Sequence, residues 1–324
     1  IPRPRPLART SGPGSLAVAP PFESVATIPF CEHVVGSTMT EEIEVTTVEG
    51  VPTADDVPTL GGMPMFGYGT WKLEDPAACT EAVETALDMG YRHVDTAQAY
   101  GNESEVGDAI ANSHVDRDEV FLATKVWVDN LAGEDVVETA YDSLDKLGTD
   151  HVDLLYVHWP SRTYDAEETL AAFDDLVDEG VTDRIGVSNF EPDQLAEACE
   201  LTDAPIFAHQ FECHPLLSQQ HLLDACEEHD VYPVAYSPLA RGSVLDVPEI
   251  ADVAAKHEAT PAQVSLAWLR QRGVTAIPKA AAEEHIRDNW GSLAVRLDDD
   301  DMEKLSSIDR VERQVDPGFA PWNN

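Results

Sequence analysis

The sequence predicts an α/β protein whose main domain is a (β/α)8 TIM barrel. From about residue 65 onward, short apolar segments of strand length alternate with amphipathic segments of helical periodicity. Eight such apolar segments follow one another within roughly 250 residues, the usual size of a closed parallel barrel. No Gly-x-Gly-x-x-Gly follows any of them, which disfavours a doubly wound dinucleotide-binding domain.

The eight expected strands are bounded by polar and turn-forming residues. They cover residues 65–70, 92–96, 120–126, 152–158, 184–188, 206–211, 232–236 and 275–278. A helix is expected over 76–89, because Asp75 can cap it and Gly90 can end it, with Pro76 suited to its first turn. A similar helix is expected over about 135–147.

The first 38 residues differ in composition from the rest. They are rich in Pro, Gly and Ser and nearly free of acidic residues, and the acidic composition begins only after Met39. A targeting peptide would also bear arginine, but this segment has no compact apolar core with a cleavage site. We therefore expect 1–38 to be a non-native or disordered extension and 39–324 to be the barrel domain. Residues 40–66 are expected to lead in as a hairpin turning at Gly61-Gly62.

Charge and cysteine content limit the classes of partner. The chain carries 61 Asp and Glu against 20 Lys and Arg, a formal net charge of -41, so nucleic acid and anionic membranes would be repelled. The acidic residues interleave with regular apolar segments, which favours a folded protein with a carboxylate surface, from a cell with a high-salt interior, over a disordered chain. No apolar run is long enough to span a membrane. The 5 cysteines lack any CxxC spacing, so we expect a reducing, cytoplasmic setting.

Four polar residues stand at or just after expected strand ends, where barrel enzymes carry their chemistry. They are Asp95, Tyr100, Lys125 and His158. Taken singly, Asp95 could cap a helix, Tyr100 could be a partly buried aromatic and His158 a satisfied core histidine. Lys125 is harder to explain structurally, because a lysine in an apolar strand is costly to bury unless a carboxylate pairs with it.

Together these four residues suit the reduction of a carbonyl group, which needs a hydride at carbon and a proton at oxygen. A phenol with its ordinary pKa of about 10 is a slow proton donor near neutrality. We expect Lys125 to lower the pKa of Tyr100, and Asp95 to keep Lys125 charged and oriented. His158 is expected to hold the carbonyl oxygen or to help pass the proton.

Three segments resemble a known family. Residues 90–107, Gly-Tyr-Arg-His-Val-Asp-Thr-Ala-Gln-Ala-Tyr-Gly-Asn-Glu-Ser-Glu-Val-Gly, are similar to the aldo-keto reductase signature with its catalytic Asp and Tyr. Thr-Lys-Val-Trp at 124–127 and Val-His-Trp-Pro at 157–160 are similar to the Lys and His segments of that family. The resemblance implies a (β/α)8 barrel that uses NAD(P)H without a Rossmann domain. The loops after His158 and Ser237 are short and resemble those of small prokaryotic members related to diketogluconate and glyoxal reductases.

The resemblance also implies where the cofactor lies. The nicotinamide would be held by strand-end amides and stacked on a tyrosine, with the pyrophosphate beside a loop of small residues. The implied cofactor residues are Ser188, Asn189, Gln210, Tyr236, Ser237, Leu239, Gly242, Lys279, His285 and Asn289.

The segment implied to bind the adenosine phosphate departs from the family pattern. Lys279 is present, but Ala280 stands where the family has Ser and His285 where it has Arg. A neutral imidazole cannot replace the permanent, bidentate charge of arginine, and helical spacing turns Arg287 away from His285. NADPH is still the expected cofactor because of Lys279, and NADH remains an alternative.

The expected substrate is a small carbonyl compound bound in an apolar pocket. Trp71, Trp127 and Trp159 occupy strand-end positions that resemble the pocket wall of the family, although each could be mere packing. The C-terminal tail, with Phe319 and Trp322, is expected to fold over the mouth. This pattern predicts a permissive pocket and a monomer or weak homo-oligomer.

Two alternatives remain open at this point. The first is a catalytically silent nucleotide-binding redox sensor or regulatory subunit on the same fold, which an altered Tyr100 or Lys125 would have favoured. The second is a metal-dependent barrel hydrolase, which needs clustered ligands at strand ends. The histidines outside the four-residue set are scattered, so we expect no metal site.

Overall fold

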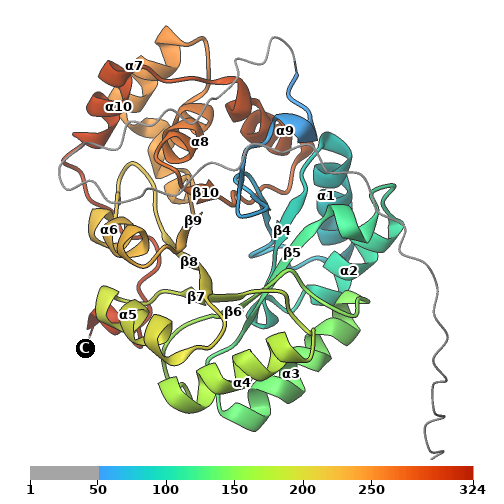
Figure 1. Ribbon diagram of the computed structural model, residues 1–324. Helices are drawn as coiled ribbons and strands as arrows, with labels where there is room; N and C mark the ends of the chain where they lie inside the picture. Colours follow the sequence, from blue (N-terminus) through green and yellow to red (C-terminus); the bar gives the residue numbers. More distant parts are fainter. Residues whose placement is uncertain (1–50, 324) are drawn as a thin grey trace, which may run out of the picture. The chain divides into compact units, whose positions relative to one another are not determined.

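The computed structural model describes residues 51–323, so the extension expected over residues 1–38 lies outside the described part. The described chain folds as a (β/α)8 barrel, as predicted (Figure 1). Eight parallel strands follow the order β10-β9-β8-β7-β6-β5-β4-β3, and a parallel bridge between Phe66 and Ala276 joins the two ends of this row. The strands are β3 (Tyr68–Gly69), β4 (His93–Asp95), β5 (Phe121–Val126), β6 (Leu154–Val157), β7 (Ile185–Ser188), β8 (Ile206–Glu212), β9 (Tyr232–Tyr236) and β10 (Thr275–Ala276).

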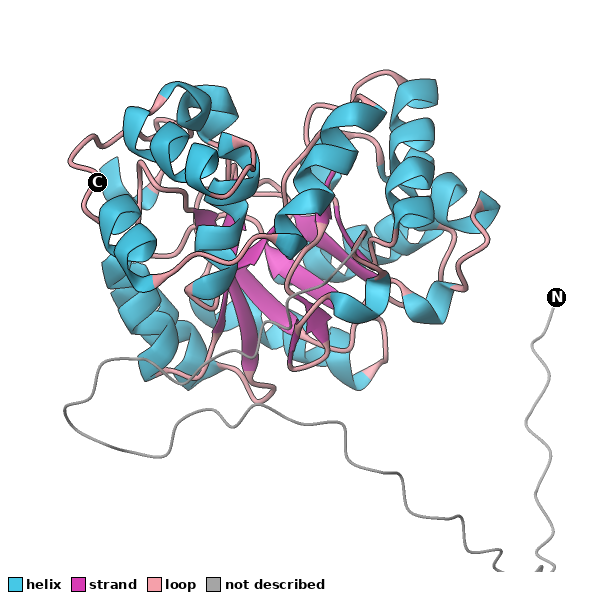
Figure 2. Cartoon of the chain, turned by 90° about the horizontal axis from the view of Figure 1, so that it is seen from above, coloured by secondary structure: helices cyan, strands magenta, loops and turns pink. Residues whose placement is uncertain are grey.

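Helices surround the strands, as the view from above shows (Figure 2). They are α1 (Pro76–Met89), α2 (Glu103–Asn112), α3 (Gly133–Leu147), α4 (Ala166–Asp178), α5 (Pro192–Leu201), α6 (Gln220–Glu228), α7 (Pro248–Lys256), α8 (Pro261–Gln271), α9 (Glu283–Gly291) and α10 (Asp299–Ser306). Within the described residues, no helix is both long and apolar enough to cross a membrane.

Local capping chemistry sets the first of these helices. The Asp75 side chain accepts a hydrogen bond from the Ala78 N–H at 2.9 Å, and Pro76 occupies the first turn. Gly90 ends α1 with φ 119°, a left-handed conformation that favours glycine. The predicted limits of this helix are therefore those observed.

A short hairpin closes the amino-terminal end of the barrel. Strand β1 (Thr59–Leu60) pairs antiparallel with β2 (Met63–Pro64), and both Gly61 and Gly62 have positive φ in the turn between them. Met63 is buried against residues that start the barrel strands, including Phe121 of β5. Since the hairpin seals this end, the opposite end, where the strands finish, is left to form a site.

Polar residues mark that opposite end. The last residues of several strands are buried although they are charged or polar: Asp95, Ser188 and Glu212 end β4, β7 and β8. Buried polar side chains of this kind must find partners. Their partners define the candidate active site.

Candidate active site

A buried ion pair lies at the centre of the site. Lys125 of β5 is 0 % exposed, and its Nζ donates to Asp95 Oδ1 at 2.5 Å and to the Thr96 carbonyl oxygen at 2.8 Å. The same Nζ lies 3.4 Å from the hydroxyl oxygen of Tyr100. The side chains of Asp95, Lys125 and Tyr100 thus meet, as their positions at neighbouring strand ends predict.

The second oxygen of Asp95 reaches across the barrel. Asp95 Oδ2 accepts a hydrogen bond from Gln210 Nε2 of β8 at 2.8 Å. Both carboxylate oxygens are therefore engaged, one by a cation and one by an amide, which lowers the cost of burying the charge. This bond links the ion pair to a residue for which the sequence suggested cofactor binding.

Tyr100 and His158 converge at the mouth of the barrel. Tyr100 ends the 3-10 turn η2 (Gln98–Tyr100) directly after β4 and is half-buried. Its ring meets the His158 ring edge-on, with 5.8 Å between centroids. His158 is buried after β6, its Nδ1 has no hydrogen-bond partner among residues 51–323, and its ring also meets Trp127 at 5.1 Å.

The electrostatics of the site differ from the expectation in one respect. Burial, reinforced by the negative charges of Asp95 and of an ionised Tyr236, raises the pKa of Tyr100 well above its ordinary value. The expected lowering of the Tyr100 pKa is therefore wrong, because burial of the phenol and the negative charge of Asp95 both favour its protonated form. Burial likewise lowers the pKa of Lys125, with Asp95 opposing the shift. The pKa of His158 is lowered well below its usual range, first by burial and then by the charge of Lys125, so its imidazole is neutral.

A second set of hydrogen bonds joins the ends of β6, β7 and β9. Asn189 Nδ2 donates to the His158 carbonyl oxygen at 3.0 Å and to Ser188 Oγ at 2.9 Å, while Asn189 Oδ1 accepts from the Tyr236 hydroxyl at 2.7 Å. Asn189 adopts φ 63°, a left-handed conformation that asparagine tolerates better than most residues. The result is a rigid polar patch beside the Lys125–Tyr100 contact.

The loop after β9 is strained in a way that suits anion binding. Ser237, Ala240 and Arg241 have φ of 47°, 47° and 52°, and Gly242 has φ 100°. Such conformations cost non-glycine residues free energy and are concentrated at ligand sites. The same loop contains the half-buried Leu239.

Two cations flank the ring of Trp71 near this loop. The Arg241 guanidinium carbon lies 4.7 Å from the ring centroid and Lys72 Nζ lies 4.6 Å from it. Cationic side chains beside a strained loop form a donor set that fits a diphosphate. Trp71 thus packs against two cations, and its expected place in the wall of the substrate pocket stays a prediction.

The residues expected to contact the adenosine phosphate lie on and before α9. Lys279 is exposed just after β10, and the His285 side chain is 70 % exposed. Arg287 Nη2 lies 2.6 Å from Glu283 Oε1, one turn earlier on the same helix, so its charge is already paired. Asn289 is buried.

Aromatic side chains and the C-terminal tail form one wall of the mouth. Phe319 lies 5.5 Å from Trp159 and 6.2 Å from Trp127, ring centroid to centroid, and Trp322 lies 5.5 Å from Trp159. Because Trp127 also touches His158, this wall adjoins Tyr100 and His158. In the described part of the chain, no group of three or more His, Cys, Asp or Glu side chains is arranged to hold a metal ion.

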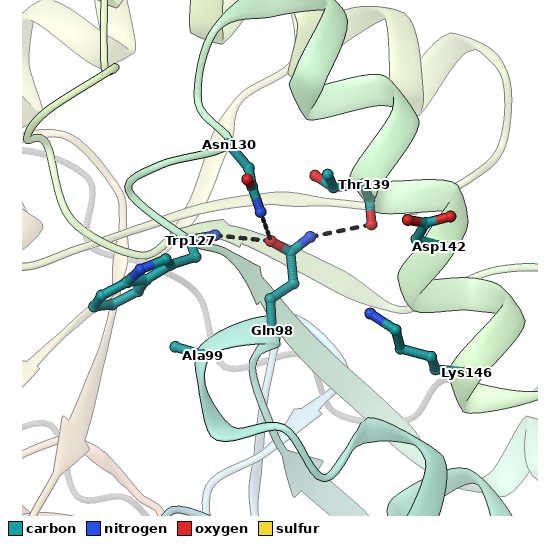
Figure 3. A pocket seen from close by; sticks show the side chains of 7 residues that line it. All are labelled: Gln98, Ala99, Trp127, Asn130, Thr139, Asp142 and Lys146. Atoms are coloured by element: carbon teal, nitrogen blue, oxygen red, sulfur yellow. Dashed lines mark hydrogen bonds between the residues drawn. The ribbon is translucent and has the colours of Figure 1, made fainter.

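One residue that supports the site was missed by sequence reasoning. Gln98, two positions before Tyr100, accepts hydrogen bonds at Oε1 from the Trp127 N–H and from Asn130 Nδ2, both at 3.0 Å. Its Nε2 donates to the Thr139 carbonyl oxygen at 3.1 Å, as Figure 3 shows. The same Nε2 also donates to Ser143 Oγ at 3.3 Å. The only sequence indication of this role was a polar Gln98 between two alanines in the signature segment. Its hydrogen-bond partners lie far away in sequence, so they could not be predicted.

Comparisons with known proteins agree with this geometry. A model of the Aldo/keto reductase family matches residues 65–310. Methylglyoxal reductase DkgB of Escherichia coli O157:H7 is 39% identical over 266 residues, covering 81% of this chain and 99% of the relative. Glyoxal reductase of Bacillus subtilis is 37% identical over 251 residues, covering 78% of this chain and 91% of the relative.

Solved structures give the same result. A putative 2,5-diketo-D-gluconic acid reductase B superposes with a TM-score of 0.77 at 38% identity, covering 80% of this chain and 92% of that one. An aldo-keto reductase complexed with NADPH superposes with a TM-score of 0.74 at 33% identity, covering 79% and 88%. The chain therefore belongs to the aldo/keto reductase family.

Proposed function

We propose that this enzyme reduces small aldehydes and ketones to alcohols with NADPH, and that Tyr100 is the proton donor. The observation that carries the proposal is the contact of the Tyr100 hydroxyl with the buried Lys125–Asp95 pair, beside a neutral His158. A phenol, a buried cation and a neutral imidazole that meet at a barrel mouth suit the protonation of a carbonyl oxygen.

When bound along the strand ends, NADPH would supply the hydride for the carbonyl carbon. Tyr100 holds its proton until negative charge appears on the carbonyl oxygen, and it then donates the proton to that oxygen. The Lys125 ammonium group, 3.4 Å away, stabilises the phenolate left behind, and water then reprotonates the phenolate. Asp95 keeps Lys125 charged, and neutral His158 can donate a hydrogen bond that orients the carbonyl oxygen.

The cofactor site is proposed along the ends of β7, β8 and β9. The amides of Asn189 and Gln210 and the hydroxyl of Ser188 suit the nicotinamide carboxamide, and the ring of Tyr236 suits stacking. The strained loop with Ser237, Leu239 and Gly242 suits the pyrophosphate, with Arg241 and Lys72 as nearby cations. We place the adenosine moiety by Lys279, His285 and Asn289.

NADPH is proposed over NADH because Lys279 is an exposed cation just after β10. His285 is a weaker phosphate ligand than arginine, and the pairing of Arg287 with Glu283 removes the nearest substitute. The preference should therefore be modest.

The proposed substrates are methylglyoxal-sized aldehydes and small aromatic aldehydes. The names of the relatives indicate the first group. The wall formed by Trp127, Trp159 and Phe319 supports the second, because apolar rings favour flat apolar substituents. The intact Tyr100–Lys125–Asp95 set does not favour the silent sensor.

The cellular setting is also a proposal. The acid excess supports a high-salt interior, and four unpaired cysteines in the described part support a reducing cytoplasm. Because the proposed site lies within one barrel, we propose that a monomer or a weak homo-oligomer is active.

The direct test is oxidation of NADPH by methylglyoxal or an aromatic aldehyde in roughly molar KCl, with NADH run in parallel. We expect turnover with both cofactors and a modest preference for NADPH, which His285→Arg should increase. A folded enzyme that binds NADPH but reduces nothing in a broad carbonyl panel would instead support the sensor.

A further inference from the structure

Glu212 is a buried carboxylate for which the proposed reaction has no use. It ends strand β8, two residues after Gln210, and is 0 % exposed. A carboxylate so placed is costly unless its oxygens receive several hydrogen bonds. Its partners therefore indicate what the residue does.

Two of the three hydrogen bonds to Glu212 come from the backbone of the C-terminal tail. The N–H of Gln314 donates to Oε1 at 2.6 Å, and the N–H of Val315 donates to Oε2 at 2.8 Å. The third partner is His214, whose Nε2 lies 2.9 Å from Oε1. A carboxylate oxygen accepts hydrogen bonds, so His214 Nε2 is the donor in this contact, while His214 Nδ1 is buried without a partner in the described part of the chain.

The tail beyond this anchor is a compact unit with bonds of its own. Asp316 Oδ1 accepts hydrogen bonds from Trp322 Nε1 at 2.9 Å and from Asn323 Nδ2 at 2.8 Å. The N–H of Ala320 donates to the Pro317 carbonyl oxygen at 2.9 Å. Because the turn is held internally, its position on the barrel depends on packing at one end. At the other end it depends on the Glu212 anchor and on the neighbouring bond from the Glu312 N–H to the Leu216 carbonyl oxygen at 2.9 Å.

The packing end of this unit is the aromatic wall of the proposed carbonyl pocket. Phe319 contacts the rings of Trp127 and Trp159, and Ala320 is buried in a cluster with Val128 and Trp159. Phe319 and Trp322 are only half-buried, so ring packing alone covers them incompletely. Hydrogen bonds to a charged carboxylate are stronger than neutral ones, so the two bonds to Glu212 add a substantial restraint to this packing.

We propose that Glu212 is a positioning residue that sets the substrate preference of the pocket, by anchoring the tail that carries Phe319. The inference rests on the proposed carbonyl reduction but concerns which carbonyl is accepted. A substrate with an aromatic substituent uses the wall, whereas a substrate as small as methylglyoxal lies within reach of Tyr100 and His158 without it.

Glutamine is an informative replacement at this position. It keeps the size of the side chain but has one acceptor oxygen and one NH2 group in place of two acceptor oxygens. Whichever way the amide is turned, at least one tail N–H faces a donor and loses its bond. Asp, which keeps both oxygens on a shorter side chain, should restore part of the anchoring.

The experiment uses the full chain in roughly molar KCl and measures two quantities for wild type, Glu212→Gln and Glu212→Asp. The first is hydrogen–deuterium exchange at the amides of Gln314 and Val315. The second is the ratio of kcat/KM for phenylglyoxal to kcat/KM for methylglyoxal. For Glu212→Gln we expect exchange at least about tenfold faster and a ratio roughly tenfold lower, the size of one lost aromatic contact. For both quantities, Glu212→Asp should give values between those of the wild type and Glu212→Gln.

Two further variants separate the anchor from the wall and from general destabilisation. Phe319→Ala should lower the ratio while leaving the two amides protected, and it still tests the wall if Glu212→Gln does not fold. Gln314→Ala keeps the backbone N–H and removes only the two long side-chain bonds to Ser243 and Glu312, both 3.5 Å, so neither quantity should change appreciably. NADPH affinity should stay within about twofold throughout.

Unchanged exchange in Glu212→Gln would overturn the anchor, and faster exchange with an unchanged ratio would overturn its role in specificity. An unchanged ratio in Phe319→Ala would overturn the wall. If the wild type reduces neither aldehyde, the proposed function fails, but the exchange measurement still decides whether Glu212 holds the tail.

Discussion

Lys125 shows how a single residue couples folding to chemistry. A charge with no exposed surface is tolerated in β5 because Asp95 and the Thr96 carbonyl oxygen accept two of its three N–H groups. The third N–H group points to the hydroxyl oxygen of Tyr100, 3.4 Å away. The arrangement that stabilises the buried lysine therefore also presents it to the phenol.

Replacement of Asp95 by Asn tests this coupling through the pH dependence of reduction. Asp95 raises the pKa of Tyr100 and opposes the lowering of the pKa of Lys125, so both pKa values should fall when its charge is removed. Both active forms, phenol and ammonium, are then lost at lower pH. We expect the alkaline limb of kcat/KM to move at least about one pH unit toward neutrality.

The measurement is a pH profile of NADPH-dependent methylglyoxal reduction for wild type and Asp95→Asn. A limb that stays in place, or that moves to higher pH, would show that Asp95 does not control these two groups. Glu191→Gln, a change of a half-buried carboxylate on another loop, serves as the matched control and should leave the profile unaltered.

Sequence reasoning at this scale predicted which residues meet but not how strongly each is buried. Asp95, Tyr100, Lys125 and His158 could be grouped because parallel strands end at the same edge of a barrel. The direction of the Tyr100 pKa shift was wrong, because the degree of burial of the phenol depends on chain segments far apart in sequence. Glu212 was missed for the same reason, since its backbone partners are about 100 positions away.

At the scale of elements, Gln98 joins three segments that surround the mouth. Its hydrogen bonds connect the turn η2, which carries Tyr100, to the loop after β5 and to α3. The His158 ring also contacts the rings of Tyr100 and Trp127, whereas Gln98 fixes the backbone around them through hydrogen bonds. Proton transfer demands placement within a few tenths of an ångström, so this cross-link should matter for turnover.

Gln98→Leu keeps the approximate volume and removes all four hydrogen bonds. We expect kcat for methylglyoxal to fall by about tenfold or more, because Tyr100 is no longer held in place, while NADPH affinity changes less than about twofold. Asn130→Ala, which removes only one of the four bonds, should have a much smaller effect. Steady-state kinetics measure kcat and cofactor fluorescence measures NADPH affinity. An undiminished kcat in Gln98→Leu would show that Gln98 does not position Tyr100.

Element limits were predictable where local chemistry sets them. Helix α1 begins and ends as expected because Asp75, Pro76 and Gly90 are adjacent to its ends in sequence. The strands β3 and β10 contain two residues each, shorter than the apolar runs suggested, because regular pairing is confined to the few residues that meet the neighbouring strand. Helix α3 begins at Gly133, two residues before the expected start.

At the scale of the whole molecule, the acid excess dominates the surface. The 61 acidic residues face only 20 basic ones, and many of the ion pairs, such as Lys304–Asp252 at 3.0 Å, join exposed side chains worth little individually. Mutual repulsion of the remaining carboxylates opposes the compact state. The core and the buried polar site must hold the fold against this repulsion.

Salt should therefore stabilise the enzyme. Molar salt shortens the screening length to roughly 3 Å, which weakens repulsion between surface carboxylates far more than it weakens the buried Lys125–Asp95 pair. We expect the Tm to rise by several degrees or more between about 0.2 M and molar KCl. Thermal unfolding followed by circular dichroism provides the measurement, and a Tm that is constant or falls with KCl would contradict the high-salt interpretation.

The most direct test of the central claim, that Tyr100 donates the proton in an NADPH-dependent reduction, is the Tyr100→Phe variant. Phenylalanine preserves the ring that packs on His158 and removes only the hydroxyl beside Lys125. We predict that NADPH binding, followed by cofactor fluorescence, stays within a few-fold of wild type, while kcat for methylglyoxal falls by about a hundredfold or more. Turnover within about tenfold of wild type would show that another group supplies the proton and would contradict the account.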